Sequence, residues 1–180
     1  KKGIKSGKVK LTDAQKLGVK YYDDLKERIP RDEMDKWNKI FTKLLVSDTD
    51  VYFKWDLVGS YRRGLPSSSD LDLIITGKNN EDIIKILDKK GYLVAEISNG
   101  SHSSIVLVRL NDKSMVRQLD ITNFDDPLGY TYGLLHSTGP DNHVILMQER
   151  AKDMDYKILN TYGLYDKKNN RLYVNSEKDI

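Results

Sequence analysis

The chain is 180 residues long, with 38% hydrophobic and 32% charged residues, a balance typical of one compact unit or two small subdomains and not of a disordered tail. It contains no cysteine, which excludes disulfides, thiolate metal sites and thiol nucleophiles and fits a reducing compartment. The formal net charge of +3 permits a polyanionic partner without identifying one.

The N-terminal segment is basic. Five lysines and no acidic residue occur in the first ten positions, with Lys8 and Lys10 nearest the body of the chain. One interpretation is a solvated, mobile terminus, and the other is an arm that contacts nucleic-acid phosphates. No apolar segment follows these lysines, and no apolar run approaches the length that spans a bilayer. We therefore expect no signal peptide, no membrane contact and an intracellular location.

Two helices are predicted after this arm. Thr12 and Gln15 have the spacing of a capping box, which marks the start of the first helix. Its apolar face consists of Leu17, Tyr21, Tyr22 and Leu25. Pro30 interrupts the pattern, and a second helix is predicted from about Arg31. Its core-facing residues are Met34, Trp37, Ile40, Phe41 and Leu44. Residues 1–45 are thus predicted to be a basic arm and a helical lead-in.

An α+β core is predicted over residues 46–125. The alternation of apolar and polar residues, with Gly and Asn at the turns, predicts strands over Val51–Val58, Leu71–Thr76, Tyr92–Ile97, Ser104–Leu110 and Met115–Thr122. A helix over about Asn80–Lys90 separates the second and third of these strands and ends at Gly91.

A smaller mixed lobe is predicted over residues 126–180. Its predicted elements are a helix from Asp125-Asp126-Pro127 to about Leu135, a helix after Thr138-Gly139-Pro140-Asp141 that ends near Asp153, a strand pair formed by Lys157–Leu159 and Arg171–Val174, and a last helix capped by Ser176.

Two acidic residues enter the second predicted strand of the core. Asp70 and Asp72 alternate along it, so their side chains point to one face, roughly 6.5 Å apart. Such carboxylates repel each other unless a proton or a cation intervenes, and oxygen-only ligands suit Mg²⁺. We expect a third acid on an adjacent strand. Asp120 is the best candidate, because Asp125 and Asp126 lie in a turn and are typical of helix caps.

A turn rich in Gly, Ser and Arg precedes these acids. Gly59-Ser60 follows a predicted strand and is predicted to open a helix whose backbone N–H groups favour an anion. Arg62 and Arg63 match phosphate oxygens, and Ser67-Ser68-Ser69 supply further donors. A phosphate site directly before a metal-binding acid pair predicts phosphoryl or nucleotidyl transfer. The Gly-Ser turn alone or the Asp-x-Asp pair alone is weak evidence for such a site. The two at this spacing, with a third acid on a later strand, are much stronger evidence.

These residues resemble the DNA polymerases of family X. The resemblance covers most of the chain and is carried by Leu11–Met34, Gly59–Gly64 with Ser68–Asp72, Thr138-Gly139 and Ser176–Ile180. It implies an α+β fold: a nucleotidyltransferase palm, with a mixed β-sheet and helices packed on one face, N-terminal helices and a small C-terminal α/β lobe. That lobe, residues 126–180, would be the nucleotide-selecting subdomain.

The resemblance also implies roles for single residues. Asp70 and Asp72 would hold two Mg²⁺ ions, which Mn²⁺ could replace, and Asp120 would bind only the catalytic ion and help to remove the proton from the primer 3′-hydroxyl. The implied nucleotide-binding residues are Ser60, Arg63, Ser68, Ser69, His136, Gly139 and Asp141. The implied DNA contacts are Lys8, Lys10 and Arg117.

Several positions depart from the family pattern. Ser69 stands where many members have Gly, and Gln118 stands where the most familiar member has Arg beside the third acid. His136-Ser137 replaces a Tyr-Phe pair that lies against the nucleotide sugar, and Val144 and Gln148 replace residues that contact the nascent base pair. These changes predict a polymerase with relaxed discrimination between bases or sugars.

The predicted function is a repair-type, DNA-directed DNA polymerase of the base excision kind, a monomer that adds dNMP from dNTP at gaps. The alternatives are a nucleotidyltransferase on the same palm that works without a template or adds nucleotides to RNA ends or to a small molecule, and an inactive module that binds DNA ends. The family's N-terminal lyase domain and its last C-terminal stretch are missing from the sequence. We expect either a minimal viral member, located in host cytoplasm or virion, or part of a longer nuclear protein.

Overall fold

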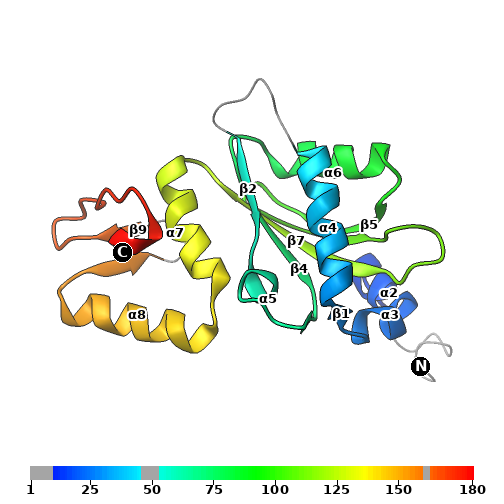
Figure 1. Cartoon of the computed structure of the whole chain (residues 1–180), viewed down its shortest axis with the longest axis horizontal. Helices are drawn as coiled ribbons and strands as arrows, with labels where there is room; N and C mark the ends of the chain where they lie inside the picture. Colours follow the sequence, from blue (N-terminus) through cyan, green and yellow to red (C-terminus); the bar gives the residue numbers. More distant parts are fainter. Residues whose placement is uncertain (1–9, 46–52, 160–162) are drawn as a thin grey trace.

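The computed structural model describes residues 10–45, 53–159 and 163–180. Figure 1 shows a larger part, built on a sheet, and a smaller part that contains the C-terminus, with helix α7 between them. None of the helices in the described ranges is both long and apolar enough to cross a membrane.

The lead-in contains one more helix break than the sequence predicted. Its elements are α2 (Asp13–Lys20), α3 (Tyr22–Lys26), β1 (Ile29–Pro30) and α4 (Arg31–Leu44). The capping box of Thr12 and Gln15 is present. The predicted single helix divides at Tyr21, which is the C-cap of α2 and the N-cap of α3. In α4 the buried residues Met34, Trp37 and Phe41 follow helical spacing, as predicted.

A five-stranded mixed sheet forms the core of the larger part. Its strands are β2 (Lys54–Leu57), β4 (Leu71–Thr76), β5 (Leu93–Asn99), β6 (Ser103–Val108) and β7 (Arg117–Phe124). They lie in the order β2-β4-β7-β6-β5, and only the β4–β7 pair is parallel. Strand β7 starts and ends two residues later than the predicted strand Met115–Thr122. Part of the predicted strand Val51–Val58 lies outside the described residues.

The two faces of this sheet differ. Leu71, Leu73 and Ile75 of β4 belong to the main core, together with residues of α4 and of α6 (Asn80–Lys89). In Figure 1, α4 lies across the sheet on this side. Ile74 faces the other way and packs with Phe124 in a second cluster. Asp72, at an even position of β4, therefore lies on the face away from the main core.

Helix α7 (Pro127–Thr138) packs on that second face. A Cβ atom at Gly133 would lie 2.0 Å from the Phe124 ring, so only glycine permits this approach of α7 to β7. Asp126 caps the helix by accepting a hydrogen bond from the Gly129 N–H, as expected for a capping acid. The helix ends at Thr138, three residues later than predicted.

The smaller part continues with α8 (Asp141–Asp153), β8 (Lys157–Leu159), β9 (Gly163–Tyr165) and the short helix η1 (Glu177–Asp179). The predicted pairing of 157–159 with 171–174 is wrong, because β8 pairs with β9. Arg171 forms an isolated bridge with Tyr165. The nearer partner closes a shorter loop, which has the smaller entropic cost.

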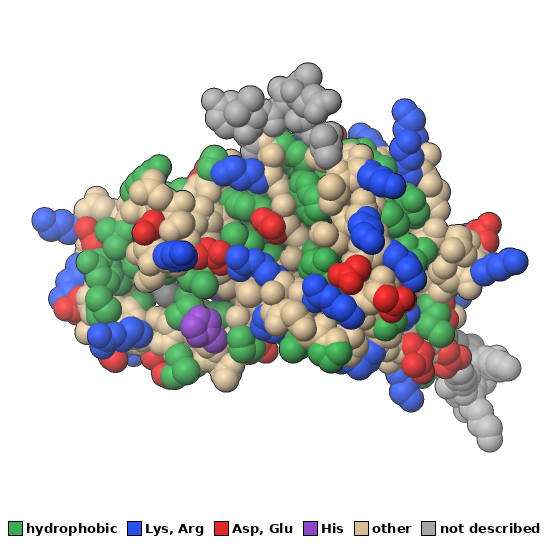
Figure 2. All heavy atoms as spheres, viewed as in Figure 1, with side chains coloured by type: hydrophobic (Ala, Val, Ile, Leu, Met, Phe, Trp, Pro, Cys, Tyr) green, Lys and Arg blue, Asp and Glu red, His purple; other side chains and the backbone are tan. Residues whose placement is uncertain are grey.

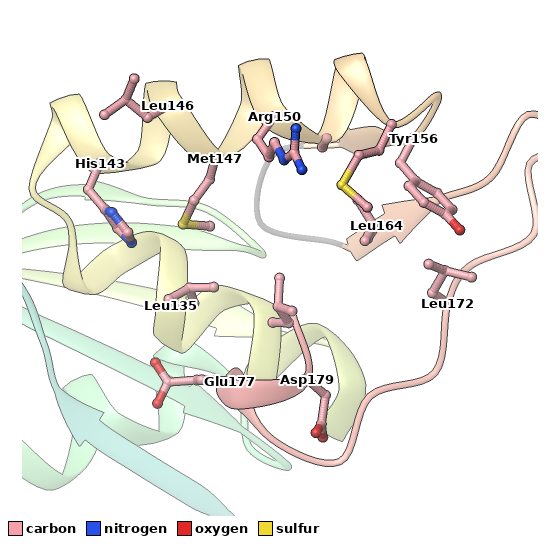
Figure 3. Close-up of a pocket in the computed structure, with 13 residues that line it drawn as sticks. Leu135, His143, Leu146, Met147, Arg150, Tyr156, Leu164, Leu172, Glu177 and Asp179 are labelled. Carbon is pink, nitrogen blue, oxygen red and sulfur yellow. The ribbon is translucent and has the colours of Figure 1, made fainter.

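An apolar hollow of about 570 Å³ lies in the smaller part, between α8, α7 and the C-terminal segment. Figure 3 shows Leu135 and Met147 on the two helices that border it, with Leu164 and Leu172 on the opposite strand and loop. None of the three predicted metal-binding acids lines this hollow. It is separate from the site described below.

Candidate active site

Two of the predicted acids lie side by side on the sheet. Because β4 and β7 are parallel and in register, Asp72 is paired with Asp120. Neighbouring strands are about 4.8 Å apart, and paired residues point to the same face. Asp70 precedes Asp72 by two residues and lies just before the start of β4. The sequence prediction that a third acid would lie on an adjacent strand agrees with this placement.

Asp72 and Asp120 have raised pKa values. Burial raises the pKa of Asp72 to about 7, with further contributions from Asp70 and then Asp120, while Arg63 acts in the opposite direction. Burial also raises the pKa of Asp120. There the Gln118 side chain donates a hydrogen bond of 2.9 Å to Oδ1 and lowers the pKa, and Asp70 raises it. The site therefore concentrates negative charge that a cation would stabilise.

The donor set fits Mg²⁺, since it consists of carboxylate oxygens on one sheet face. The side chains are not already drawn together as a metal centre: within the described ranges, no group of three His, Asp or Glu residues has that arrangement. Two features are nevertheless compatible with a cation here. The neighbouring acids contribute to the raised pKa of Asp72, and a glycine leaves space for the Asp72 carboxylate.

That glycine is Gly59, the first residue of the one-turn helix α5 (Gly59–Arg62). Its φ of +55° is rarely adopted by other residues, and a Cβ atom there would lie 1.9 Å from Asp72 Oδ2. The Val58 N–H also donates to the Asp72 carbonyl. The turn and the acid are thus in direct contact, although they are more than ten residues apart in the sequence.

The predicted phosphate-binding residues surround this contact. Arg63 donates to Ser60 Oγ at 3.1 Å. The hydroxyls of Ser68 and Ser69 donate to Asp70 Oδ1, at 3.4 and 3.1 Å. Because α5 has only four residues, the helix dipole expected from the sequence is small here. The groups of this loop that could bind an anion are therefore its side-chain donors and the arginine charge.

Arg28 is a further cation at this loop that the sequence analysis did not identify. It donates to Ser67 Oγ at 2.7 Å and to the Ser67 carbonyl at 2.9 Å. The contact depends on the pairing of β1 with β3 (Ser67–Ser68), across 39 positions of sequence. A local sequence pattern could not have revealed it, since the pairing is tertiary.

The smaller part reaches the same loop through the end of α7. Arg63 donates to the Thr138 carbonyl at 2.5 Å, and Gly139 lies next to the Arg63 guanidinium. Burial lowers the pKa of His136, which precedes this turn, while Asp141 acts to raise it. The structure therefore brings the end of α7, residues 136–139, to the loop of Ser60 and Arg63, while Asp141 is exposed at the start of α8.

The predicted DNA contact of Arg117 does not agree with its surroundings. Its side chain is 4% exposed and forms an ion pair of 2.6 Å with Glu33. It also donates to the Glu27 carbonyl at 2.9 Å. We therefore interpret Arg117 as a structural residue. Lys10 is exposed at the start of the described residues, and Lys8 lies outside them.

Charge is mixed on the face seen in Figure 2. Lysine and arginine side chains are spread among acidic and apolar ones and do not form a single basic patch. This agrees with the small net charge of the chain.

Comparisons with known proteins agree with this geometry. The family model of the DNA polymerase beta palm matches residues 28–126, and that of the DNA polymerase beta thumb matches residues 133–180. DNA polymerase lambda of Arabidopsis thaliana is 27% identical over 172 residues, covering 86% of this chain and 32% of that protein. DNA nucleotidylexotransferase of Xenopus laevis is 28% identical over 219 residues, covering 96% of this chain and 42% of that protein.

The chain spans less than half the length of each of these two curated relatives. The palm model alone matches more than half of the chain, and the thumb model matches most of the remainder. The acids on β4 and β7 and the loop of Ser60 and Arg63 all lie within the palm match. The chain therefore belongs to family X of the DNA polymerases, the polymerase β family of DNA nucleotidyltransferases.

Proposed function

We propose that this protein is a repair-type, DNA-directed DNA polymerase that adds dNMP from dNTP to a primer 3′-hydroxyl at gaps. The observation that carries the proposal is the register of β4 on β7, which sets Asp72 beside Asp120. The same sheet face adjoins the loop of Ser60 and Arg63, where a triphosphate would be bound.

The residues of this chain have distinct roles in the proposed reaction. Arg28, Arg63, Ser60 and the serines before Asp70 bind and orient the triphosphate. Asp120 accepts the proton of the primer 3′-hydroxyl, which suits its raised pKa. When bound, two Mg²⁺ ions supply the charge that activates this hydroxyl and stabilises the leaving pyrophosphate.

The smaller part contacts the rest of the nucleotide in this proposal. The turn at 136–139 lies against the sugar, and Asp141 lies beside the base. His136-Ser137, Val144 and Gln148 stand at positions where the family pattern has other residues, and we propose relaxed base or sugar discrimination. Misinsertion and ribonucleotide insertion frequencies measured on one-nucleotide gaps test this. Frequencies as low as those of a member with the family residues would contradict it.

The central experiment compares the wild-type chain with Asp120→Asn on gapped duplex DNA with dNTPs and Mg²⁺. Asp120→Asn keeps the side-chain volume, and we expect its extension rate to fall by at least about 100-fold. Asp88→Asn, an exposed acid on α6, is the matched control and should extend at the wild-type rate. Equal extension by wild type and Asp120→Asn would refute the assigned role.

Template use separates the main proposal from its alternative, which the 28% identity to a nucleotidylexotransferase supports. Each of the four dNTPs is supplied singly with a gapped duplex and with a single-stranded primer. Template-directed choice on the gap supports the proposal. Extension of the single strand with no template preference supports terminal transfer. In a parallel reaction with RNA primers, extension confined to RNA supports an enzyme that adds nucleotides to RNA ends.

Three further statements also remain proposals. We propose that residues 46–125 are the catalytic palm, with the lead-in before it and the nucleotide-selecting subdomain at 126–180. We propose that the protein acts as a monomer, which light scattering of the protein with and without gapped DNA would test. We propose an intracellular location, where gapped DNA is available.

A further inference from the structure

Arg31 connects the lead-in to both ends of the loop that precedes Ser67. Its guanidinium donates to the Tyr61 carbonyl at 2.7 Å and lies over the Tyr61 ring, 4.1 Å from the centroid. Its backbone N–H donates to the Pro66 carbonyl at 2.9 Å. One residue of α4 thus fixes the first and last residues of the segment 61–66.

The second half of that segment, residues 64–66, has few other restraints. Gly64, Leu65 and Pro66 are exposed, so little apolar burial holds them. Within the segment and its neighbour, the Gly64 N–H donates to the Tyr61 carbonyl and the Leu65 N–H donates to the Ser60 carbonyl. These short-range bonds shape the turn but do not attach it to the rest of the protein. On the side of the lead-in, Arg31 and the β1–β3 pairing make that attachment, while on the side of the smaller part the Arg62 and Arg63 side chains bond to Thr138 and Glu177.

The Arg31 guanidinium has its own structural partners. Asp35, one turn along α4, forms an ion pair with Arg31 at 3.3 Å. Burial, and then the Asp35 carboxylate, raises the pKa of the Tyr61 hydroxyl, which places Asp35 beside that ring as well. Arg31, Tyr61 and Asp35 thus form one cluster on the α4 side of the loop. These contacts of Arg31 are with Tyr61 and Asp35 and do not reach Asp70, Asp72 or Asp120.

We infer that Arg31 is a positioning residue, which holds the loop of Arg62 and Arg63 in the geometry that binds a triphosphate. This inference rests on the proposed function of the site. A planar guanidinium can donate to a carbonyl and stack on a ring at the same time, which a lysine ammonium cannot do in the same geometry. Because Arg31 acts on the loop before and after the chemical step alike, its loss weakens nucleotide binding without slowing the step itself.

The test compares Arg31→Met and Arg31→Lys with Lys36→Met. Lys36 lies on the same helix and forms an exposed ion pair with Asp32, so its variant controls for the loss of a charge from α4. We expect both Arg31 variants to raise the KM for dNTP by about tenfold, the effect of one charged hydrogen bond, with kcat within about twofold. Lys36→Met should leave both constants unchanged.

Two kinetic results would overturn the inference. An unchanged KM in Arg31→Met would show that the loop does not need this residue. A fall in kcat at constant KM would show that Arg31 takes part in the chemical step, as a catalytic residue would.

Amide hydrogen exchange without nucleotide tests the same inference independently of activity. Exchange at Gly64 and Leu65 should be about tenfold faster in Arg31→Met than in Lys36→Met, because the loop opens more often. Equal exchange rates would overturn the inference even for an active polymerase. A wild-type protein without transferase activity would refute the proposed function, and the exchange comparison would still decide whether Arg31 holds the loop.

Discussion

At the residue scale, the contact between Gly59 and Asp72 sets the geometry of the candidate site. The backbone of the turn approaches the carboxylate so closely that a side chain has no space. The same glycine has a positive φ, so two independent constraints act on one position. A second glycine of the loop, Gly64, has only the second constraint, which makes the pair a useful comparison.

We predict that Gly59→Ala reduces primer extension by about 100-fold, because its Cβ displaces the Asp72 carboxylate by an ångström or more. Gly64→Ala is the control: its φ is +75°, but a Cβ there meets no atom within 4 Å. In urea titrations Gly64→Ala should lose about 1 kcal/mol of unfolding free energy from its positive φ, and Gly59→Ala should lose more because its Cβ also overlaps Asp72. Similar activities of the two variants would contradict the role of the contact.

Asp72 also makes the stability of the metal-free protein depend on pH. Its folded pKa of about 7 lies above the ordinary value of 3.8, so the folded state binds the proton more tightly than the unfolded state. The free energy of unfolding gained from this tighter proton binding is fully present below about pH 4 and is lost as the pH rises to about 7. Above that pH the loss is complete.

We therefore predict that Asp72→Asn raises the unfolding free energy at pH 8, by at least about 1 kcal/mol, and changes it little at pH 4. Urea titrations at both pH values check this, with Asp88→Asn as a control that removes an exposed acid. Adding Mg²⁺ at pH 8 should stabilise the wild type, and its removal by EDTA should reverse the effect. If Asp72→Asn stabilised the protein equally at both pH values, the titration of Asp72 would not be the cause of the stabilisation.

At the element scale, α7 connects the palm to the smaller part, and its first turn depends on Asp126. Burial acts to raise the pKa of this carboxyl, but hydrogen bonds from the Gly129 N–H and Arg171 outweigh it and lower the pKa. Arg171 pairs with Asp126 at 2.9 Å, so the cap also attaches the C-terminal segment to the start of the helix.

We predict that Asp126→Ala lowers the unfolding free energy by about 1–2 kcal/mol, the usual effect of removing a cap. Asp126→Asn can still accept the hydrogen bond from Gly129 and should lose less. Asp125→Ala, at the neighbouring exposed position, is the control. Urea titration gives the free energies, and faster hydrogen exchange confined to α7 would locate the effect. Equal losses of unfolding free energy in Asp126→Ala and Asp126→Asn would show that the charge of Asp126 stabilises the protein, and not its hydrogen bond to Gly129.

At the scale of the whole molecule, the Arg117–Glu33 ion pair joins the lead-in to the sheet. Both side chains are largely buried, with 4% and 14% exposed. The Val116 N–H donates to Asp24 Oδ2 beside the pair, so α3, α4 and β7 meet there. On the opposite face of β7 lies Asp120, whose position depends on the strand that this pair attaches.

We predict that Arg117→Met destabilises the protein by about 3 kcal/mol, because it leaves the Glu33 carboxylate buried without its partner. Arg109→Met, which breaks an exposed pair with Asp112, should cost less than about 1 kcal/mol. Binding to gapped DNA, measured for the folded fraction over a range of salt, should keep its wild-type salt dependence. A reduced salt slope would instead indicate a phosphate contact.

The local features of this chain were predictable. The capping box at Thr12 and the apolar spacing of α4 were predicted and are present, because each depends on neighbours within a turn or two. The strand that follows Asp70 was predicted for the same reason, and Asp72 lies in it while Asp70 immediately precedes it. The departures at Gln118 and His136 also came from the sequence, and their consequences for fidelity stay predictions.

Contacts between distant segments were not predictable. The Arg28–Ser67 contact depends on a strand bridge across 39 residues, and the partner of β8 depended on a turn that the sequence pattern did not distinguish. Arg117 was read as a basic residue for DNA because charge in a sequence carries no information on burial. Only the packed structure shows which cations already have a partner.

The sequence by itself determined the chemistry available to this protein: an acid pair on one strand face, a third acid in a later strand, and a loop of serines and arginines. The tertiary structure decided how these groups meet. The parallel register of β4 and β7 sets Asp72 beside Asp120, and the close approach of Gly59 sets the loop against them. The physical reason is range, because helix caps and strand alternation act between near neighbours, whereas register and close approach depend on the packing of the whole core.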